Sequence, residues 1–265
     1  MDINTRAGAG LPRPLIGCST KSFLTTDGWL HWVQAIRNGL ASRVGSAEDV
    51  FACVPFPLLA ETRSVLQSLG VRVGAQDVSA FSPGAYTGEV SAELLAGLGC
   101  KLVMVGHPER ATHLGETGEV FAAKAGAAAN AGMVPILIVG EPERGADPEP
   151  VIRPQLDVAF ARVASDAPVM VAYEPTWAIG QATPAPPAHV VSVVRRIRAI
   201  LAERDGESRI LYGGSAGSGT FASIAARGRE VGAVDGIPDG VFLGRASLDP
   251  EVFLSIVDEV RATVV

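Results

Sequence analysis

The sequence predicts a single-domain (β/α)8 barrel, and three observations favour this fold class. Eight short apolar runs alternate with helical or helix-length segments along 265 residues, which matches the number of units and the length of such a barrel. The apolar runs are nearly continuous, as expected for parallel strands that are buried on both faces. No linker divides the chain, so we expect one α/β domain over residues 15–265.

The expected strands are short runs rich in Val, Ile and Leu that stop at glycine, proline or a polar residue. They cover residues 15–18, 50–54, 71–75, 101–105, 134–139, 169–173, 209–212 and 241–243. Between several of them, apolar residues recur at helical spacing, at 29–40, 58–69, 91–98, 120–131 and 188–202. Segment 141–154 is rich in Pro, Gly and acidic residues, and we interpret it as a loop after the fifth strand.

A doubly wound open sheet is the alternative fold for this alternation of strands and helices. Its dinucleotide site would need a Gly-x-Gly-x-x-Gly turn after the first strand, and the sequence has none there.

The composition argues against several classes of protein. Residues 1–14 lack an apolar run, so we expect a flexible N-terminal tail and neither a signal peptide nor an anchor. The longest apolar stretch, 133–139, is too short to span a bilayer. The formal net charge of −6 argues against nucleic acid as a partner. Cys18, Cys53 and Cys100 lie in apolar runs, which predicts reduced thiols in a cytoplasmic protein.

The histidines do not suggest a metal site. They are scattered along the chain, and no Cys or His pair has the spacing of metal ligands. We therefore expect no metal, and we place His31 and His189 on the exposed surfaces of helices.

Polar residues and glycines follow five of the expected strands, at the point where each strand ends. In a (β/α)8 barrel these ends share one face, which is where such barrels place their active sites. The residues collected in this way are Ser19, Lys21, His107, Glu109, Glu174, Gly213, Gly214, Ser215, Gly244 and Arg245.

Residues 171–180, Val-Ala-Tyr-Glu-Pro-Thr-Trp-Ala-Ile-Gly, form the most informative segment. Glu174 follows a strand, beneath a loop that carries the large apolar side chain of Trp177. This arrangement suits a general base that is shielded from water. Pro175 stiffens one end of the loop and Gly180 frees the other, so the loop can close as a lid. The alternative is a surface turn with a solvated glutamate.

His107 and Lys21 are the other candidates for chemistry. Pro108 predicts a short helix after His107, whose positive N-terminal potential keeps the imidazole neutral and able to donate to a carbonyl oxygen. Lys21 follows an apolar strand, and a half-buried lysine needs an anion, either Glu109 or a substrate phosphate. The alternatives are a capping or core histidine and a solvated loop lysine.

Glycine-containing turns end the last two expected strands, at Tyr212–Ser215 and Phe242–Arg245. Glycines let backbone N–H groups approach a phosphate, and barrels often bind phosphate at these two loops. The guanidinium of Arg245 can also reach a phosphate or a substrate hydroxyl. Alternatively, the glycines only make tight turns and Arg245 points outward to Asp249.

The chain after the tail resembles the triosephosphate isomerase family. Tyr173-Glu-Pro-Thr-Trp-Ala-Ile-Gly180 is close to that family's base-and-lid signature, and Gly106-His-Pro-Glu-Arg110 is similar to its catalytic-histidine segment. Tyr212-Gly-Gly-Ser215 matches its phosphate loop, and segment 74–89 looks like its dimer-contacting third loop.

This resemblance implies a TIM barrel that interconverts glyceraldehyde 3-phosphate and dihydroxyacetone phosphate, in glycolysis and gluconeogenesis, without a cofactor. Glu174 is then the base that moves a proton between adjacent carbons through an enediolate. His107 is the electrophile, and Lys21, with Glu109 beside it, supplies fixed positive charge. The phosphate is held by backbone groups of Gly180, Ser215, Gly244 and Arg245. The resemblance also implies a homodimer through the loop Gln76–Glu89, with Thr87 beside the neighbouring subunit's Lys21.

Four positions depart from the family pattern, and all lie around the expected substrate site. Ser19 stands where the family usually has asparagine, Pro108 where it has serine, and Arg245 where it has a second glycine. The lid continues through Gln181-Ala-Thr-Pro184 in place of a Gly-Lys-Thr run. These changes resemble a side branch that acts on four-carbon ketose phosphates such as erythrulose phosphate, in tetritol catabolism. The alternative from another class is an inactive barrel that only binds phosphate ligands.

Overall fold

The computed structural model describes residues 10–43, 45–145, 147–181 and 183–264, and it shows the expected closed barrel. All eight strands are parallel and follow chain order, with the last strand paired to the first. They are β1 (Leu15–Ser19), β2 (Val50–Val54), β3 (Arg72–Ala75), β4 (Leu102–Val105), β5 (Val134–Val139), β6 (Val169–Tyr173), β7 (Ser208–Tyr212) and β8 (Gly240–Leu243). Their bounds agree with the expected ones to within one residue at each end.

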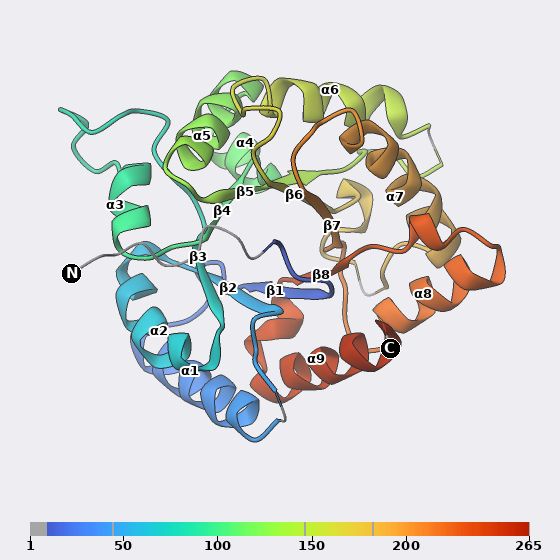
Figure 1. Ribbon diagram of the computed structural model, residues 1–265, viewed down its shortest axis with the longest axis horizontal. Helices are drawn as coiled ribbons and strands as arrows, with labels where there is room; N and C mark the ends of the chain where they lie inside the picture. The colour runs from blue at the N-terminus through green and yellow to red at the C-terminus, as the bar shows by residue number, and fades with distance from the viewer. Residues whose placement is uncertain (1–9, 44, 146, 182, 265) are drawn as a thin grey trace.

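A ring of helices surrounds the strands (Figure 1). Its members are α1 (Thr26–Ala41), α2 (Leu59–Leu66), α3 (Ala92–Gly97), α4 (Pro108–Leu114), α5 (Gly118–Asn130), α6 (Glu149–Ala159), α7 (Pro187–Leu201), α8 (Thr220–Glu230) and α9 (Pro250–Val264). Short 3-10 helices lie at η1 (Phe56–Leu58), η2 (Gln67–Leu69), η3 (Thr176–Ala178), η4 (Val234–Gly236) and η5 (Arg245–Leu248).

Apolar periodicity explains why the long helices face the barrel. In α1, Trp29, Val33, Ile36 and Leu40 recur at helical spacing and are all buried. The hydroxyl of Thr25 caps the first turn by accepting a backbone N–H. The sequence thus sets both the start of this helix and the face that it buries.

The core has two layers, one inside the barrel and one between the barrel and the helices. Side chains alternate along each strand, so in β1 the side chain of Leu15 belongs to the inner layer and that of Ile16 to the outer one. The inner layer consists of Leu15, Phe51, Cys53, Leu102, Met104, Ile136, Ile138, Met170, Ala172, Leu211 and Phe242. It fills the barrel and forms a floor beneath the face where the strands end.

The prediction of a loop over 141–154 is wrong for residues 149–154, because α6 begins at Glu149. Pro150 falls in the first turn, where a missing N–H breaks no helical hydrogen bond. Pro154 lies inside the helix and costs one such bond. Burial of the apolar face that includes Leu156 offsets this cost, so tertiary packing overrides the local signal.

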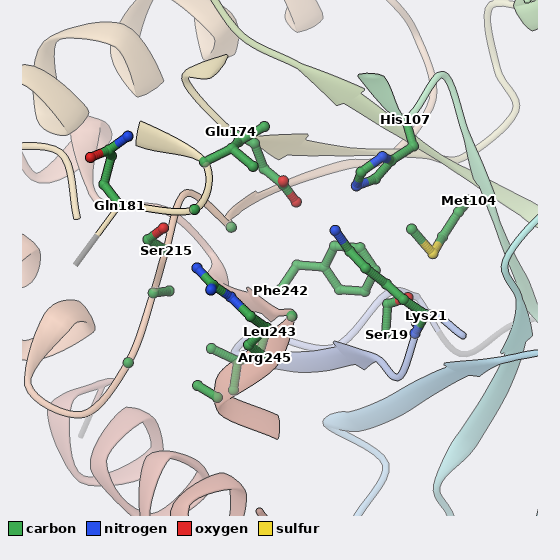
Figure 2. A pocket seen from close by; sticks show the side chains of 17 residues that line it. Ser19, Lys21, Met104, His107, Glu174, Gln181, Ser215, Phe242, Leu243 and Arg245 are labelled. Atoms are coloured by element: carbon green, nitrogen blue, oxygen red, sulfur yellow. Dashed lines mark hydrogen bonds between the residues drawn. The ribbon is translucent and has the colours of Figure 1, made fainter. Parts of the chain in front are cut away.

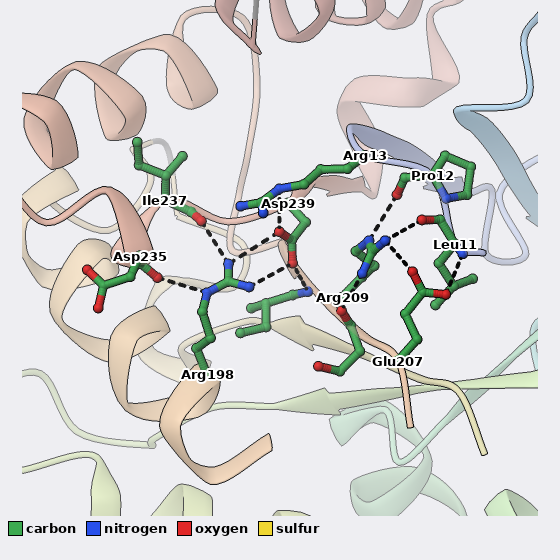
Figure 3. Close-up of polar contacts among 11 residues, drawn as sticks. Leu11, Pro12, Arg13, Arg198, Glu207, Arg209, Asp235, Ile237 and Asp239 are labelled. Carbon is green, nitrogen blue, oxygen red and sulfur yellow. Dashed lines mark hydrogen bonds and ion pairs between the residues drawn. The ribbon is translucent and has the colours of Figure 1, made fainter. Parts of the chain in front are cut away.

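The segment before β1 is tied to the lower rim of the barrel (Figure 3). The backbone N–H of Leu11 donates to Glu207 Oε2 at 2.6 Å, and the guanidinium of Arg209 donates to the carbonyl of Leu11. Residues 1–9 lie outside the described residues, so a flexible tail stays a prediction for them.

Asp239 is the centre of the lower rim, at the seam where β8 meets β1. Its buried carboxylate pairs with Arg13 at 2.9 Å and with Arg198 at 3.3 Å. Its carbonyl accepts the N–H of Leu15 at 2.9 Å. The next residue must be glycine, because a Cβ on Gly240 would lie 1.7 Å from the carbonyl oxygen of Leu15. The first and last strands of the barrel therefore meet in a tightly packed junction.

The cysteines are buried free thiols, as expected. Burial raises the pKa of Cys18 to about 12 and that of Cys100 to about 11, so both stay protonated at neutral pH. Among the helices that the structure describes, none is long and apolar enough to cross a membrane.

Candidate active site

A cavity of about 320 Å³ opens at the carboxyl ends of the strands, above the inner core layer (Figure 2). Its walls are formed by Ser19, Lys21, Met104, His107, Glu174, Ile179, Gly180, Gln181, Gly213, Ser215, Ala216, Gly217, Phe242, Leu243, Gly244, Arg245 and Ala246. The structure thus brings together most of the residues expected from the strand ends. Glu109 and Gly214 lie beside the cavity and do not line it.

Glu174 follows β6 and points its carboxylate into the cavity toward His107 (Figure 2). It is buried, so the alternative of a solvated surface glutamate is wrong. Burial raises the pKa of Glu174 to about 7, with a smaller contribution from Glu109 and an opposing one from Lys21. Gly213 makes room for this side chain, because a Cβ there would lie 2.5 Å from Glu174 Oε1. A carboxylate with this pKa is well matched to taking a proton at neutral pH.

His107 is the N-cap residue of α4, and its ring is held in one tautomer. Its Nδ1 accepts the backbone N–H of Glu109 at 3.1 Å, which places the ring proton of the neutral form on Nε2. Burial, helped by the charge of Lys21, lowers the pKa of His107 to about 4. The neutral ring therefore makes no ion pair with the Glu109 carboxylate 3.5 Å away. It presents an N–H donor to the cavity (Figure 2).

Lys21 lies in a tight turn after β1, with a positive φ of 46° that is unusual for a residue with a side chain. Gln76 supports this turn, because its Nε2 donates to the carbonyl of Lys21 at 3.1 Å. The Lys21 ammonium donates to Glu109 Oε1 at 2.5 Å, which is the contact expected from the sequence. These two contacts hold the backbone turn and the ammonium of Lys21 at the mouth of the cavity.

The residues after Glu174 form a lid over one side of the cavity. Trp177, in η3, anchors the start of the lid by donating its Nε1–H to Glu141 Oε1 at 2.9 Å. Ser215 holds the middle, since its hydroxyl donates to the carbonyl of Ala178 at 2.7 Å. In the structure the lid therefore contacts the loop that follows β7.

A polar cluster beneath the lid was not predicted from the sequence. Glu141 is fully buried and accepts from the Tyr173 hydroxyl at 3.1 Å, and it contacts His189 Nε2 at 2.8 Å. Burial raises the pKa of Glu141, but hydrogen bonds led by the one from His189 outweigh it, so the pKa is lowered. The side chain of His189 is only 21% exposed, so the prediction of a surface histidine is wrong. Helical periodicity correctly placed His189 on a helix, but it could not show that its partner is Glu141, just after β5.

The loops after β7 and β8 supply backbone donors at one end of the cavity. Ser215 has a positive φ of 53°, and its N–H and that of Gly244 have no acceptor among the described residues. Both residues line the cavity. Converging N–H groups of this kind form an anion-binding concavity.

The whole arrangement suits proton transfer between neighbouring carbon atoms. A buried base lies opposite a neutral hydrogen-bond donor, a fixed cation lies at the mouth, and backbone N–H groups that suit an anion converge at one end of the cavity. The lid covers one side of the cavity and is held there by Glu141 and Ser215.

Comparison with known proteins supports this chemistry. The sequence pattern of the family described as triosephosphate isomerase matches residues 14–260. Triosephosphate isomerase of Halorhodospira halophila is 43% identical over 236 residues, which cover 84% of this chain and 90% of that protein. L-erythrulose-1-phosphate isomerase of Pectobacterium atrosepticum is 38% identical over 256 residues, which cover 92% and 94%. The crystal structure of triosephosphate isomerase from Bartonella henselae matches with a TM-score of 0.78 at 28% identity, covering 94% of this chain and 100% of that one.

Proposed function

Because the chain belongs to the triosephosphate isomerase family, we propose that it interconverts glyceraldehyde 3-phosphate and dihydroxyacetone phosphate, as a step of glycolysis and gluconeogenesis in the cytoplasm. The observation that carries this proposal is the buried Glu174 carboxylate, with its raised pKa, opposite the neutral ring of His107. Buried free thiols support the cytoplasmic location.

The geometry supports a reaction in which one proton moves between neighbouring carbons by way of Glu174 and another moves between their oxygens. Glu174 takes a proton from the carbon beside the carbonyl, while the Nε2–H of His107 donates to the carbonyl oxygen as negative charge develops there. The resulting enediolate is stabilised by the charge of Lys21. The proton then returns from Glu174 to the neighbouring carbon, and a proton passes between the two oxygens. Carbonyl and hydroxyl have then exchanged places, with no atom gained or lost.

The direct test is a steady-state assay of the purified protein with glyceraldehyde 3-phosphate, following the appearance of dihydroxyacetone phosphate. The proposal expects turnover without any added cofactor. Binding of inorganic phosphate or of a phosphorylated sugar without turnover would instead support the inactive, ligand-binding barrel.

Ser19 favours a second candidate, the isomerisation of four-carbon ketose phosphates. An erythrulose phosphate carries one more hydroxymethyl group than a triose phosphate, on the reacting carbon remote from the phosphate. With the phosphate held near Ser215, that group would lie toward Ser19 and Met104, which line the other side of the cavity (Figure 2). The serine side chain is shorter than the asparagine usual in the family, and one relative is named L-erythrulose-1-phosphate isomerase. The ratio of kcat/KM for erythrulose phosphates and glyceraldehyde 3-phosphate decides between the two candidates.

The activity should be lost at low pH and should stay constant at high pH. Since the pKa of Glu174 is raised to about 7, kcat/KM should fall about tenfold per unit below that pH and level off above it. His107, with its pKa lowered to about 4, should add no second inflection at neutral pH. Initial rates between about pH 5 and pH 9 measure the profile, after correction for the ionisation of the substrate phosphate near pH 6. A flat profile would contradict the assignment of Glu174 as the base.

We propose a homodimer formed through the loop Gln76–Glu89, which projects from the ring between β3 and α3 (Figure 1). Phe81 and Tyr86 stack in this loop with ring centroids 4.2 Å apart, yet they are 48% and 46% exposed. Exposed paired aromatics are characteristic of a surface that a partner covers. Light scattering at micromolar concentration should give twice the mass of one chain. Replacing Tyr86 with Asp should produce monomers, and a parent protein that is monomeric and fully active would exclude this interface.

A further inference from the structure

Arg245 places a guanidinium at the end of the cavity where the backbone donors converge. It is the first residue of η5, directly after Gly244. Its side chain extends over the cavity toward Ser215 and the lid (Figure 2). The Arg245 Nη2 lies 4.0 Å from the position that a Cβ on Gly180 would occupy. The guanidinium therefore lies between the anion-binding loops and the lid. The alternative of an outward arginine paired with Asp249 is wrong.

The two cations of the cavity, Lys21 and Arg245, differ in whether a carboxylate pairs with them. Lys21 already has a carboxylate partner, because Glu109 Oε1 lies 2.5 Å from its ammonium. For Arg245, no carboxylate lies within ion-pair distance in the described part of the chain. The chain carries a formal net charge of −6, so its overall field does not attract anions. An uncompensated guanidinium is therefore the strongest local attraction for a phosphate dianion at this end.

We propose that the Arg245 guanidinium is a direct ligand of the substrate phosphate. This inference rests on the proposed function and deepens it. The N–H groups of Ser215 and Gly244 hold the phosphate from the loops, and Arg245 contacts it from the side of the lid.

Arg245 is a binding residue in this scheme and does not tune the base. The charged neighbours that shift the pKa of Glu174 are Lys21 and Glu109, and Arg245 is not among them. Loss of its charge should therefore weaken phosphate binding while the inflection of the pH profile stays where it is. A purely structural residue would not produce this combination.

The test compares Arg245→Gln and Arg245→Lys with the parent protein. Calorimetric titration with inorganic phosphate gives Kd without any need for turnover, and steady-state kinetics with triose phosphate gives kcat and KM. Arg227→Gln is the matched control, because Arg227 is an exposed arginine on α8, away from the cavity and paired with Glu230. It removes the same charge without touching the site. Circular dichroism confirms that each variant is folded.

We expect Arg245→Gln to weaken the phosphate Kd and raise KM by roughly 10-fold to 100-fold, the size of a lost charge-assisted hydrogen bond. Arg245→Lys should lose less, because it keeps the charge but not the planar fork. A change in Kd of less than about threefold, as for a surface charge, would overturn the inference even if the protein is an active isomerase. Phosphate binding that depends on Arg245 in a protein without turnover would uphold the inference and refute the proposed function.

Discussion

Replacing Glu174 with Gln is expected to lower kcat by about 10²-fold to 10⁴-fold, the largest effect among the changes considered. The amide has the shape of the carboxylate and fits beside Gly213, but it cannot accept the proton from the substrate carbon. The phosphate loops are untouched, so the Kd for inorganic phosphate should be nearly unchanged. Steady-state kinetics and phosphate titration of the same preparation measure both quantities. Retention of more than about a tenth of kcat would mean that another group is the base.

The free energy of unfolding of the same variant, compared with that of the parent at two pH values, also shows whether the variant is folded. Because the folded state raises the pKa of Glu174 from 4.5 to about 7, it binds this proton more tightly than the unfolded chain. The stability of the parent protein therefore falls as pH rises through this window. Gln has no ionisable proton, so the stability of the variant does not fall with pH for this reason. It should be more stable than the parent at pH 8, by up to about 3 kcal/mol, and this difference should vanish near pH 4.

Replacing His107 with Gln is expected to lower kcat by roughly 10²-fold to 10³-fold, with a smaller change in KM. The hydrogen bond from Nε2 strengthens as charge develops on the substrate oxygen, and loss of such a donor costs about 3 kcal/mol in the transition state. A glutamine amide is more flexible and is not locked by the N–H of Glu109 that holds the ring. Kinetics with glyceraldehyde 3-phosphate measure the split between kcat and KM.

His31→Gln is the control, since His31 is exposed on α1 and lies outside the cavity. An NMR titration of the ring resonances checks the charge state directly. The His107 signal should stay that of a neutral ring from pH 8 down to about pH 5, because burial lowers its pKa to about 4. A charged His107 at pH 7 would contradict its role as a neutral donor.

The fold, and the placement of the main candidate residues in one cavity, were predictable because their signals are local. A parallel strand buried on both faces is a continuous apolar run, as in β5 and β6, so the strand bounds followed from composition. The position of an active site in a barrel is fixed by where the strands end. Glu174 and His107 could therefore be assigned to one cavity, although they are far apart along the chain.

The features that were missed depend on contacts between distant segments. The composition of α6, with its two prolines, favours a loop. The segment is helical because it packs against α5, α7 and β5. The partnership of Glu141 with His189 depends on where the end of β5 meets α7. The direction of the Arg245 side chain was left open for the same reason, because a sequence shows where a turn occurs but not which way its side chain points.

The seam between β8 and β1 also has a consequence for biosynthesis. A barrel has no free sheet edge, but this holds only after its last strand is in place. Until Gly240 pairs with Leu15, a nascent chain exposes the unpaired N–H and C=O groups of β1, together with those of the strand made most recently. We therefore expect a chain that stops before Asp239 to leave two unpaired strand edges, to which other chains can pair. Pairing of β8 with β1 removes both edges at once.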